Sequence, residues 1–372
     1  MDKDRKIGSG RLLSLDALRG FDMFFIMGGE NLLIALAAFL PAALGNGLAE
    51  QMTHVPRVGL HVYDLVFPTF LFLAGVSWPF SYAKQVEKGA TSWQIHRKIL
   101  FRMLALILLG WIHDGILQFN WETQRLASVI GRIGIAWAVA AFLYVHTGLR
   151  GQVAVFLSIL IGYWALLNFV PFPGVQVPDG VNYMSDWKYC LCGWVDRNFL
   201  EICRPGKDGG AFATLGMPPT AMLGVFAGAL LRRIDISGSR KVLLLLAGAV
   251  ALAALGAVWL PWCPCVKNSW NATFVCFAGA ISTALLAVFY WIIDVRGISG
   301  WSYAFRVIGM NSITIYMLQC FLGFRAMSRF FFGGIASLCD PAGSKLVLAA
   351  GYVLLCWLVL WFFERKRIFL KV

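Results

Sequence analysis

The sequence predicts an all-α, polytopic integral membrane protein, a helical bundle of about ten transmembrane helices with both termini in the cytoplasm. Of its 372 residues, 59% are hydrophobic and 14% are charged. Soluble domains average about 25% charged residues, so this chain has too little polar surface to cover a water-soluble fold. Its apolar residues also form runs of spanning length that alternate with short basic loops.

About ten apolar runs have the length of a membrane span. They lie at residues 17–39, 62–83, 99–118, 127–147, 151–171, 212–231, 241–260, 271–293, 302–324 and 344–363. Little chain remains between them, so we expect residues 1–372 to form a single transmembrane domain. The longest loop, 172–211, is rich in Pro, Gly, Asp and Cys and is expected to lie outside as a small cap.

The basic residues set the expected orientation. With a cytoplasmic N-terminus, every short cytoplasmic loop carries at least one Lys or Arg, as the positive-inside rule requires. The basic tail 1–11 precedes an apolar run that carries Asp22, Glu30 and Asn31, so we expect a retained span rather than a cleaved signal peptide. The net charge of +13 lies in these scattered clusters, without the contiguous basic face that nucleic-acid binding needs.

Six cysteines are expected on the outer side: Cys190, Cys192, Cys203, Cys263, Cys265 and Cys339. In an oxidising compartment they favour disulfides, although several free thiols fit as well. The CxC pairs at 190–192 and 263–265 lack the CxxC spacing typical of structural zinc sites. We therefore expect no metal.

Ionisable residues inside the spans are functional candidates, because burying them in lipid is costly. Glu30 and Asn31 end the first span, Asp64 opens the second, and Arg132 lies near the start of the fourth. Their similar depth predicts that Glu30, Asp64 and Arg132 converge on one water-accessible pocket. A structural salt bridge between Asp64 and Arg132 is the simpler alternative. Asp16 and Arg19 share a helical face and are expected to form an anchoring ion pair.

His54 is the candidate for proton transfer, because an unperturbed histidine titrates near neutrality. His54 and His61 lie in the outer loop that leads into the second span. A histidine in such a loop is usually only solvated. The sequence has no P-loop, no GxGxxG after a strand and no HExxH motif.

Several motifs, taken together and in order, resemble one family. They are SLDALRGFD at 14–22, His54 followed ten residues later by DLVFPTF at 64–70, GVS at 75–77, RLASVIGRIG at 125–134, KNSWNATF at 267–274 and GMNSITIY at 309–316. They cover almost the whole chain, and the first two are the most specific. The chain thereby resembles the heparan-α-glucosaminide N-acetyltransferase family, including its shorter bacterial relatives, within a wider group of transmembrane acyltransferases.

The resemblance implies a reaction and a place for it. Acetyl passes from cytoplasmic acetyl-CoA to the amine of a glucosamine-type amino sugar on the outer side, and the family's active histidine falls on His54. The expected orientation places His54 on that same side. The resemblance further implies a homodimer in the bacterial inner membrane. The alternative is an amino-sugar permease for N-acetylglucosamine, since polar groups inside a helical bundle also suit a transporter.

The residues that we expect to carry the reaction fall into three sets. The catalytic pair is His54, as base or as nucleophile, with Asp64 orienting it. The candidates for acceptor binding, with Asn311 or Arg132 as oxyanion donors, are Glu30, Asn31, Arg125, Arg132, Lys267, Trp270, Asn311 and Ser312. The candidates for binding the CoA phosphates, which are otherwise ordinary cytoplasmic charge, are Arg97, Lys98, Arg102, Arg232, Arg233 and Arg240.

Overall fold

The computed structural model describes residues 12–56, 58–119, 124–170, 172–173, 189–200 and 210–370. Within these ranges every regular element is a helix, which confirms the predicted all-α class. The N-terminal basic tail, Cys203 and most of the predicted outer cap at 172–211 lie outside the described residues.

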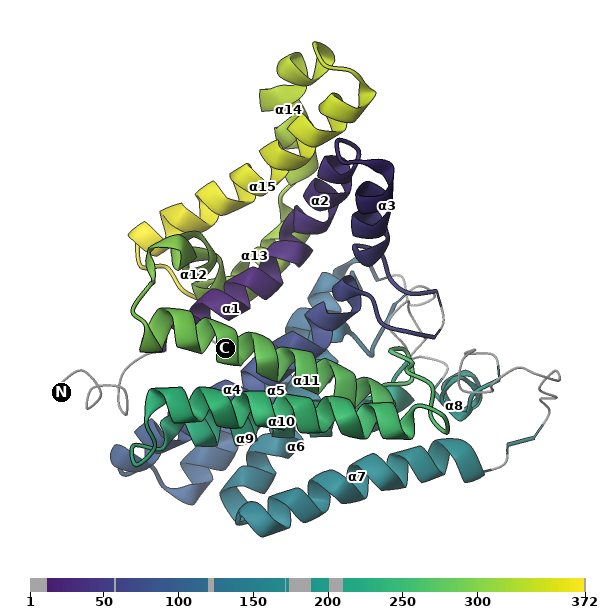
Figure 1. Ribbon diagram of the computed structural model, residues 1–372, viewed down its shortest axis with the longest axis vertical. Coiled ribbons are helices and arrows are strands. Elements are labelled where there is room, and N and C mark those ends of the chain that lie inside the picture. Colours follow the sequence, from purple (N-terminus) through teal and green to yellow (C-terminus); the bar gives the residue numbers. More distant parts are fainter. Residues whose placement is uncertain are drawn as a thin grey trace.

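One layer of the bundle consists of helices from the middle part of the chain, which are drawn across the lower part of Figure 1. Its members are α4 (Val66–Glu87), α5 (Ser92–His113), α6 (Val129–His146), α7 (Leu149–Phe169), α9 (Pro218–Arg232), α10 (Gly238–Trp259) and α11 (Ala272–Phe289). Helices α4 and α9 pack closely through small residues. A Cβ on Gly224 would lie 2.0 Å from the Phe72 carbonyl oxygen, so only glycine permits this approach.

The other layer, in the upper part of Figure 1, is formed by helices from the N-terminal and C-terminal parts of the chain. It consists of α1 (Leu13–Phe24), α2 (Glu30–Ala37), α3 (Ala42–Gln51), α12 (Tyr303–Met310), α13 (Ser312–Phe321), α14 (Phe324–Ser337) and α15 (Pro341–Arg365). A Cβ on Gly309 of α12 would lie 1.9 Å from the Asp16 carbonyl oxygen of α1. The notch at Gly309 therefore lets α1 and α12 pack closely.

The described residues contain 8 helices long and apolar enough to cross a membrane, and these fall on eight of the predicted runs. The predicted run 99–118 lies largely on α5, whose first half carries Arg97, Lys98 and Arg102. The run 302–324 is divided into α12 and α13 at Asn311. Polar residues inside the runs 99–118 and 302–324 thus explain why these two predicted spans are not among the eight long apolar helices.

The first span is bent where α1 gives way to α2. Residues Phe25–Gly29 form a π-helical turn, and Gly28 has φ of 102°, a conformation that glycine adopts without strain. The Gln319 side-chain amide donates a hydrogen bond of 3.3 Å to the Ile26 carbonyl at this turn. At the other end of α1, Arg19 Nη1 lies 4.0 Å from Asp16 Oδ1, so the predicted ion pair is present.

Candidate active site

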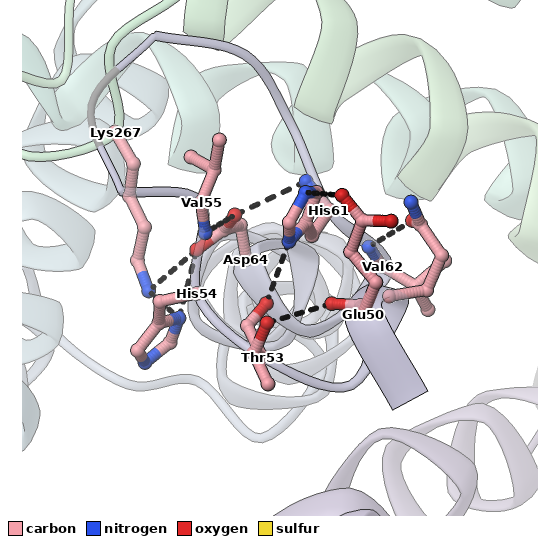
Figure 2. Close-up of polar contacts among 9 residues, drawn as sticks. Glu50, Thr53, His54, Val55, His61, Val62, Asp64 and Lys267 are labelled. Carbon is pink, nitrogen blue, oxygen red and sulfur yellow. Dashed lines mark hydrogen bonds and ion pairs between the residues drawn. The ribbon is translucent and has the colours of Figure 1, made fainter. Parts of the chain in front are cut away.

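His54 lies in the loop between α3 and the 3₁₀ turn Val62–Leu65 that precedes α4. Two hydrogen bonds hold the loop: the Gly59 amide donates to the Cys265 carbonyl at 2.9 Å, and a ring N–H of His61 donates to the Thr53 carbonyl at 3.0 Å. His61, which also caps the 3₁₀ turn, therefore shapes the loop. His54 lies instead beside Asp64 and Lys267 (Figure 2).

Asp64 is the acceptor around which the loop is organised. Its Oδ1 accepts from His54 Nδ1 at 2.8 Å, and its Oδ2 accepts from the backbone amides of Val55 at 3.2 Å and His61 at 3.1 Å. The carboxylate is fully buried, whereas the His54 side chain is 38% exposed. An ionised carboxylate only accepts hydrogen bonds. This contact therefore selects the tautomer with the proton on Nδ1, which puts the lone pair on Nε2.

Lys267 brings a positive charge to the same point from the loop between α10 and α11. Its Nζ lies 3.3 Å from Asp64 Oδ1 and 3.1 Å from His54 Nδ1 (Figure 2). A tight turn positions it: the Trp270 amide donates to the Lys267 carbonyl at 2.9 Å, and Trp270 has φ of 48°. Asn271 then caps α11 by accepting from the Phe274 amide at 3.1 Å. The buried Asp64 is thus paired with Lys267 rather than with Arg132.

His54 and Lys267 line one end of a cavity of about 220 Å³. The walls are mostly apolar side chains from α1, α4, α5, α6 and α13, together with Tyr63, Tyr316 and Ser312. The Tyr63 ring lies against His54, with 4.8 Å between ring centroids. The cavity therefore offers His54 an apolar space inside the bundle.

Arg102 lines the same cavity from the third predicted span. Its guanidinium lies 4.3 Å from the centroid of the Trp137 ring, an arrangement that holds a cation in apolar surroundings. In the predicted orientation, Arg102 belongs to the cytoplasmic half of its span and His54 to the outer side. One cavity thus touches residues expected near opposite faces of the membrane.

Of the other residues predicted to bind the acceptor, Ser312 lines this cavity and the rest do not. Ser312 lines it, but Asn311 is buried beside it and hydrogen-bonds Thr314 at 3.3 Å. Trp270 supports it indirectly, packing on Phe67 with 4.7 Å between ring centroids. Arg132 donates to Thr214 at 3.2 Å. Arg125 does not line the cavity, being half-buried in the loop before α6.

The predicted convergence of Glu30, Asp64 and Arg132 is wrong. Glu30 and Asn31 line a second pocket, together with residues of α13, α14 and α15. The reason is the bend at Gly28, which begins α2 in a new direction, and a hydrogen bond of 3.1 Å between Asn31 and Glu30. Arg132 faces Thr214 instead of Asp64.

Of the six basic residues predicted to bind CoA, Arg102 alone lines the described cavity. Arg97, Lys98 and Arg240 are exposed, and Arg232 is half-buried. Arg233 is exposed and forms an ion pair with Asp235. The structure brings none of these five to the cavity.

The described cysteines are all free thiols, so the predicted disulfides do not form among them. Cys190, Cys192, Cys263 and Cys265 are buried. No group of three or more metal-ligating side chains gathers in the part of the chain that the structure describes. Burial raises the pKa of the Cys265 thiol to about 12.

Sequence reasoning did not foresee two features of the site. It treated Lys267 as a residue for the acceptor, although the structure places its ammonium on the His54–Asp64 pair. It also overlooked Tyr63, which follows His61 by two residues and packs on His54. The motif KNSWNATF indicated that Lys267 is functional, but only the fold shows that its ammonium lies beside His54 and Asp64.

Comparison with known proteins gives the chain's relatives. No family model matches it. It is 24% identical over 370 residues to the heparan-alpha-glucosaminide N-acetyltransferase of Mus musculus, a match that covers 84% of this chain and 54% of that protein. It is 25% identical over 364 residues to the Homo sapiens protein of the same name, covering 82% of this chain and 52% of that protein. The chain thus spans about half the length of these curated relatives. It is a distant relative of the heparan-alpha-glucosaminide N-acetyltransferases.

Proposed function

We propose that this protein is a transmembrane N-acetyltransferase that moves acetyl from cytoplasmic acetyl-CoA to the amine of a glucosamine-type sugar on the outer side. The observation that carries the proposal is the cavity that joins His54 and Lys267 to Arg102. The names of the two relatives support the reaction class. By the same resemblance, we place the protein in a bacterial inner membrane, as a homodimer of single-domain chains.

The donor enters from the cytoplasmic side in this proposal. The nucleotide of acetyl-CoA is polyanionic and stays at the basic cytoplasmic surface, where Arg102 is the innermost cation. Its pantetheine arm is long and weakly polar, so a mostly apolar cavity suits it. The thioester then lies near His54. Ser312 and Tyr316 also line the cavity.

His54 acts on the acceptor amine. With Nδ1–H donating to Asp64, the Nε2 lone pair takes the amine proton as the nitrogen attacks the thioester carbonyl carbon. The carbonyl oxygen becomes an oxyanion, which the Lys267 ammonium stabilises. The C–S bond then breaks, an amide remains, and the CoA thiolate takes up a proton. The partly exposed imidazole is accessible to an acceptor from outside.

A covalent route uses the same residues. His54 Nε2 attacks the thioester first, CoA leaves, and the acetyl-imidazole then passes acetyl to the amine. The two routes differ in whether CoA is released before the acceptor binds. A burst of CoA release without acceptor, in proportion to the enzyme present, identifies the covalent route.

The test is acetyl transfer from radiolabelled acetyl-CoA to glucosamine by the purified protein. Wild type and the control His146→Ala, which changes an exposed histidine at the end of α6 that does not line the cavity, should both produce N-acetylglucosamine. His54→Ala should lose at least about 10²-fold in kcat, the usual contribution of a positioned base. An unchanged rate in a folded His54→Ala protein would refute the role of His54. Failure of wild type with any amino sugar, together with sugar uptake into vesicles, would instead support a permease.

A further inference from the structure

A polar pocket lies next to the cavity and has a largely different set of lining residues. Its volume is about 380 Å³, and its polar lining consists of Glu30, Asn31, Gln319, Arg325, Ser328, Arg329 and Tyr352. Ile26 borders both this pocket and the cavity. Glu30 is in the outer half of the first predicted span and Arg325 follows the ninth, so the pocket is expected on the outer side of the membrane.

The charges of this pocket do not neutralise one another. Arg325 and Arg329 are one turn apart on α14 and both line it. Within the described part of the chain, no carboxylate lies within salt-bridge distance of either guanidinium, and Glu30 pairs with neither. Two adjacent guanidiniums match a phosphate group, and a separate carboxylate matches an ammonium.

The helix backbone beside the pocket is interrupted, and side chains brace the interruption. A broken helix at membrane depth is tolerated where it lines a cavity, and the first span breaks at Gly28. Gly28 lies against Tyr352, since a Cβ there would be 2.7 Å from the ring. Gln319 bridges the break by donating to the Ile26 carbonyl at 3.3 Å and to the Tyr352 hydroxyl at 2.7 Å. The pocket therefore has fixed walls.

The outer surface of α14 is apolar beside these arginines. At 14 residues α14 is too short to span a bilayer, and it exposes 83% of Phe330, 60% of Phe331 and 55% of Ile335. Arginines next to exposed aromatic residues on a short helix are typical of a helix at the lipid headgroup level. Acyl chains would have an apolar surface immediately next to the charged pocket.

We propose that this pocket binds the headgroup of a zwitterionic aminophospholipid of the phosphatidylethanolamine type. Arg325 and Arg329 hold the phosphate, Glu30 accepts hydrogen bonds from the primary ammonium, and the acyl chains lie along the apolar surface of α14. The opposite charges in one pocket distinguish this ligand from an acidic lipid, which offers Glu30 no cation. This lipid site does not depend on the acetyltransferase reaction.

The test measures thermal unfolding of the delipidated, full-length protein with added phosphatidylethanolamine, phosphatidylglycerol or phosphatidylcholine. Phosphatidylethanolamine should raise the unfolding midpoint of wild type by at least about 3 °C, and more than phosphatidylglycerol does. Arg325→Gln/Arg329→Gln should lose the response to all three lipids. Glu30→Gln should lose the preference for phosphatidylethanolamine while keeping a response to phosphatidylglycerol. Lys345→Gln, an exposed cation on α15 outside the pocket, should respond as wild type does.

Native mass spectrometry of wild type, Glu30→Gln and Arg329→Lys keeps the test decisive if the double variant is unstable. It should show one tightly retained phosphatidylethanolamine per wild-type chain and fewer on Arg329→Lys, which keeps the charge but not the forked geometry. Equal retention of phosphatidylethanolamine and phosphatidylglycerol by wild type would overturn the proposal. Displacement of bound lipid by millimolar glucosamine 6-phosphate would also overturn it, because the pocket would then hold a soluble amino-sugar phosphate.

Discussion

The cavity at His54 and the polar pocket at Arg325 share Ile26 as a wall, yet they handle charge in opposite ways. In the cavity, the buried carboxylate of Asp64 is saturated by His54, Lys267 and two backbone amides. In the pocket, no ion pair among the described residues joins Glu30 to the two arginines of α14. Charge that is fully paired inside the protein orients a reacting group, whereas charge held apart at the surface is available to a ligand. The comparison therefore favours the cavity as the place of the reaction and the pocket as a place where a ligand binds.

The largest expected effect comes from removing the charge that organises the cavity. Asp64→Asn leaves the Lys267 ammonium without its buried partner and no longer selects the His54 tautomer. We expect kcat to fall about 10²- to 10⁴-fold and the free energy of unfolding to fall by about 3–5 kcal/mol. Steady-state kinetics and chemical denaturation measure the two effects. A variant that kept full activity while losing stability would make Asp64 purely structural.

The matching change in the pocket should behave differently. Because no partner of Glu30 is buried against it, Glu30→Gln should change the free energy of unfolding by less than about 1 kcal/mol in the absence of lipid. The same denaturation experiment measures it. A loss as large as that of Asp64→Asn would show that the two regions do not differ as described.

A third effect concerns the cytoplasmic end of the cavity. Arg102→Gln should raise the KM for acetyl-CoA about tenfold, the equivalent of about 1.4 kcal/mol, with a smaller change in the KM for the amino sugar. The matched control is Lys84→Gln, an exposed cation at the end of α4 that lines no described cavity. Equal changes in the two Michaelis constants would place Arg102 away from the donor.

A smaller effect is expected from substituting Tyr316, whose side chain lies between the cavity and a third pocket. Tyr316 lines the cavity and also borders a third pocket of about 480 Å³ that contains His113, on which its ring stacks at 4.2 Å. Tyr316→Ala should admit water and raise the ratio of acetyl-CoA hydrolysis to transfer severalfold, while Tyr316→Phe keeps the ratio of wild type. Product analysis of both reactions measures it. An unchanged ratio in Tyr316→Ala would show that Tyr316 does not exclude water.

The smallest effect is a difference in thiol labelling, which leaves the protein otherwise unchanged. Cys320 borders the third pocket and Cys339 is exposed, whereas Cys265 is buried with a pKa raised to about 12. A thiol with so high a pKa stays protonated and unreactive at pH 7 to 9. A charged methanethiosulfonate added outside should therefore modify Cys320 and Cys339 but not Cys265. Labelling of Cys265 in the folded protein would contradict the packing of the 260–271 loop.

The fold class could be predicted from the sequence because each membrane-spanning helix needs a long run of apolar residues. Eight of the predicted runs coincide with long apolar helices. The sequence also predicted His54 with Asp64, since their spacing is local and forms part of a motif. The environment of Glu30 depends on the bend at Gly28, where one glycine with φ of 102° redirects the chain. The charged partner of Asp64 is Lys267, which comes from the distant loop between α10 and α11. Such long-range pairings follow from packing and not from residue spacing.

The measurement that tests the account most directly is sided acetyl transfer in sealed vesicles of uniform orientation, with labelled acetyl-CoA and glucosamine each confined to a chosen side. If one cavity joins Arg102 near the cytoplasm to His54 near the outside, N-acetylglucosamine forms when acetyl-CoA is on the cytoplasmic side and glucosamine on the outer side. Wild type should show this product, and His54→Ala should not. Transfer that requires both substrates on the same side would contradict the account.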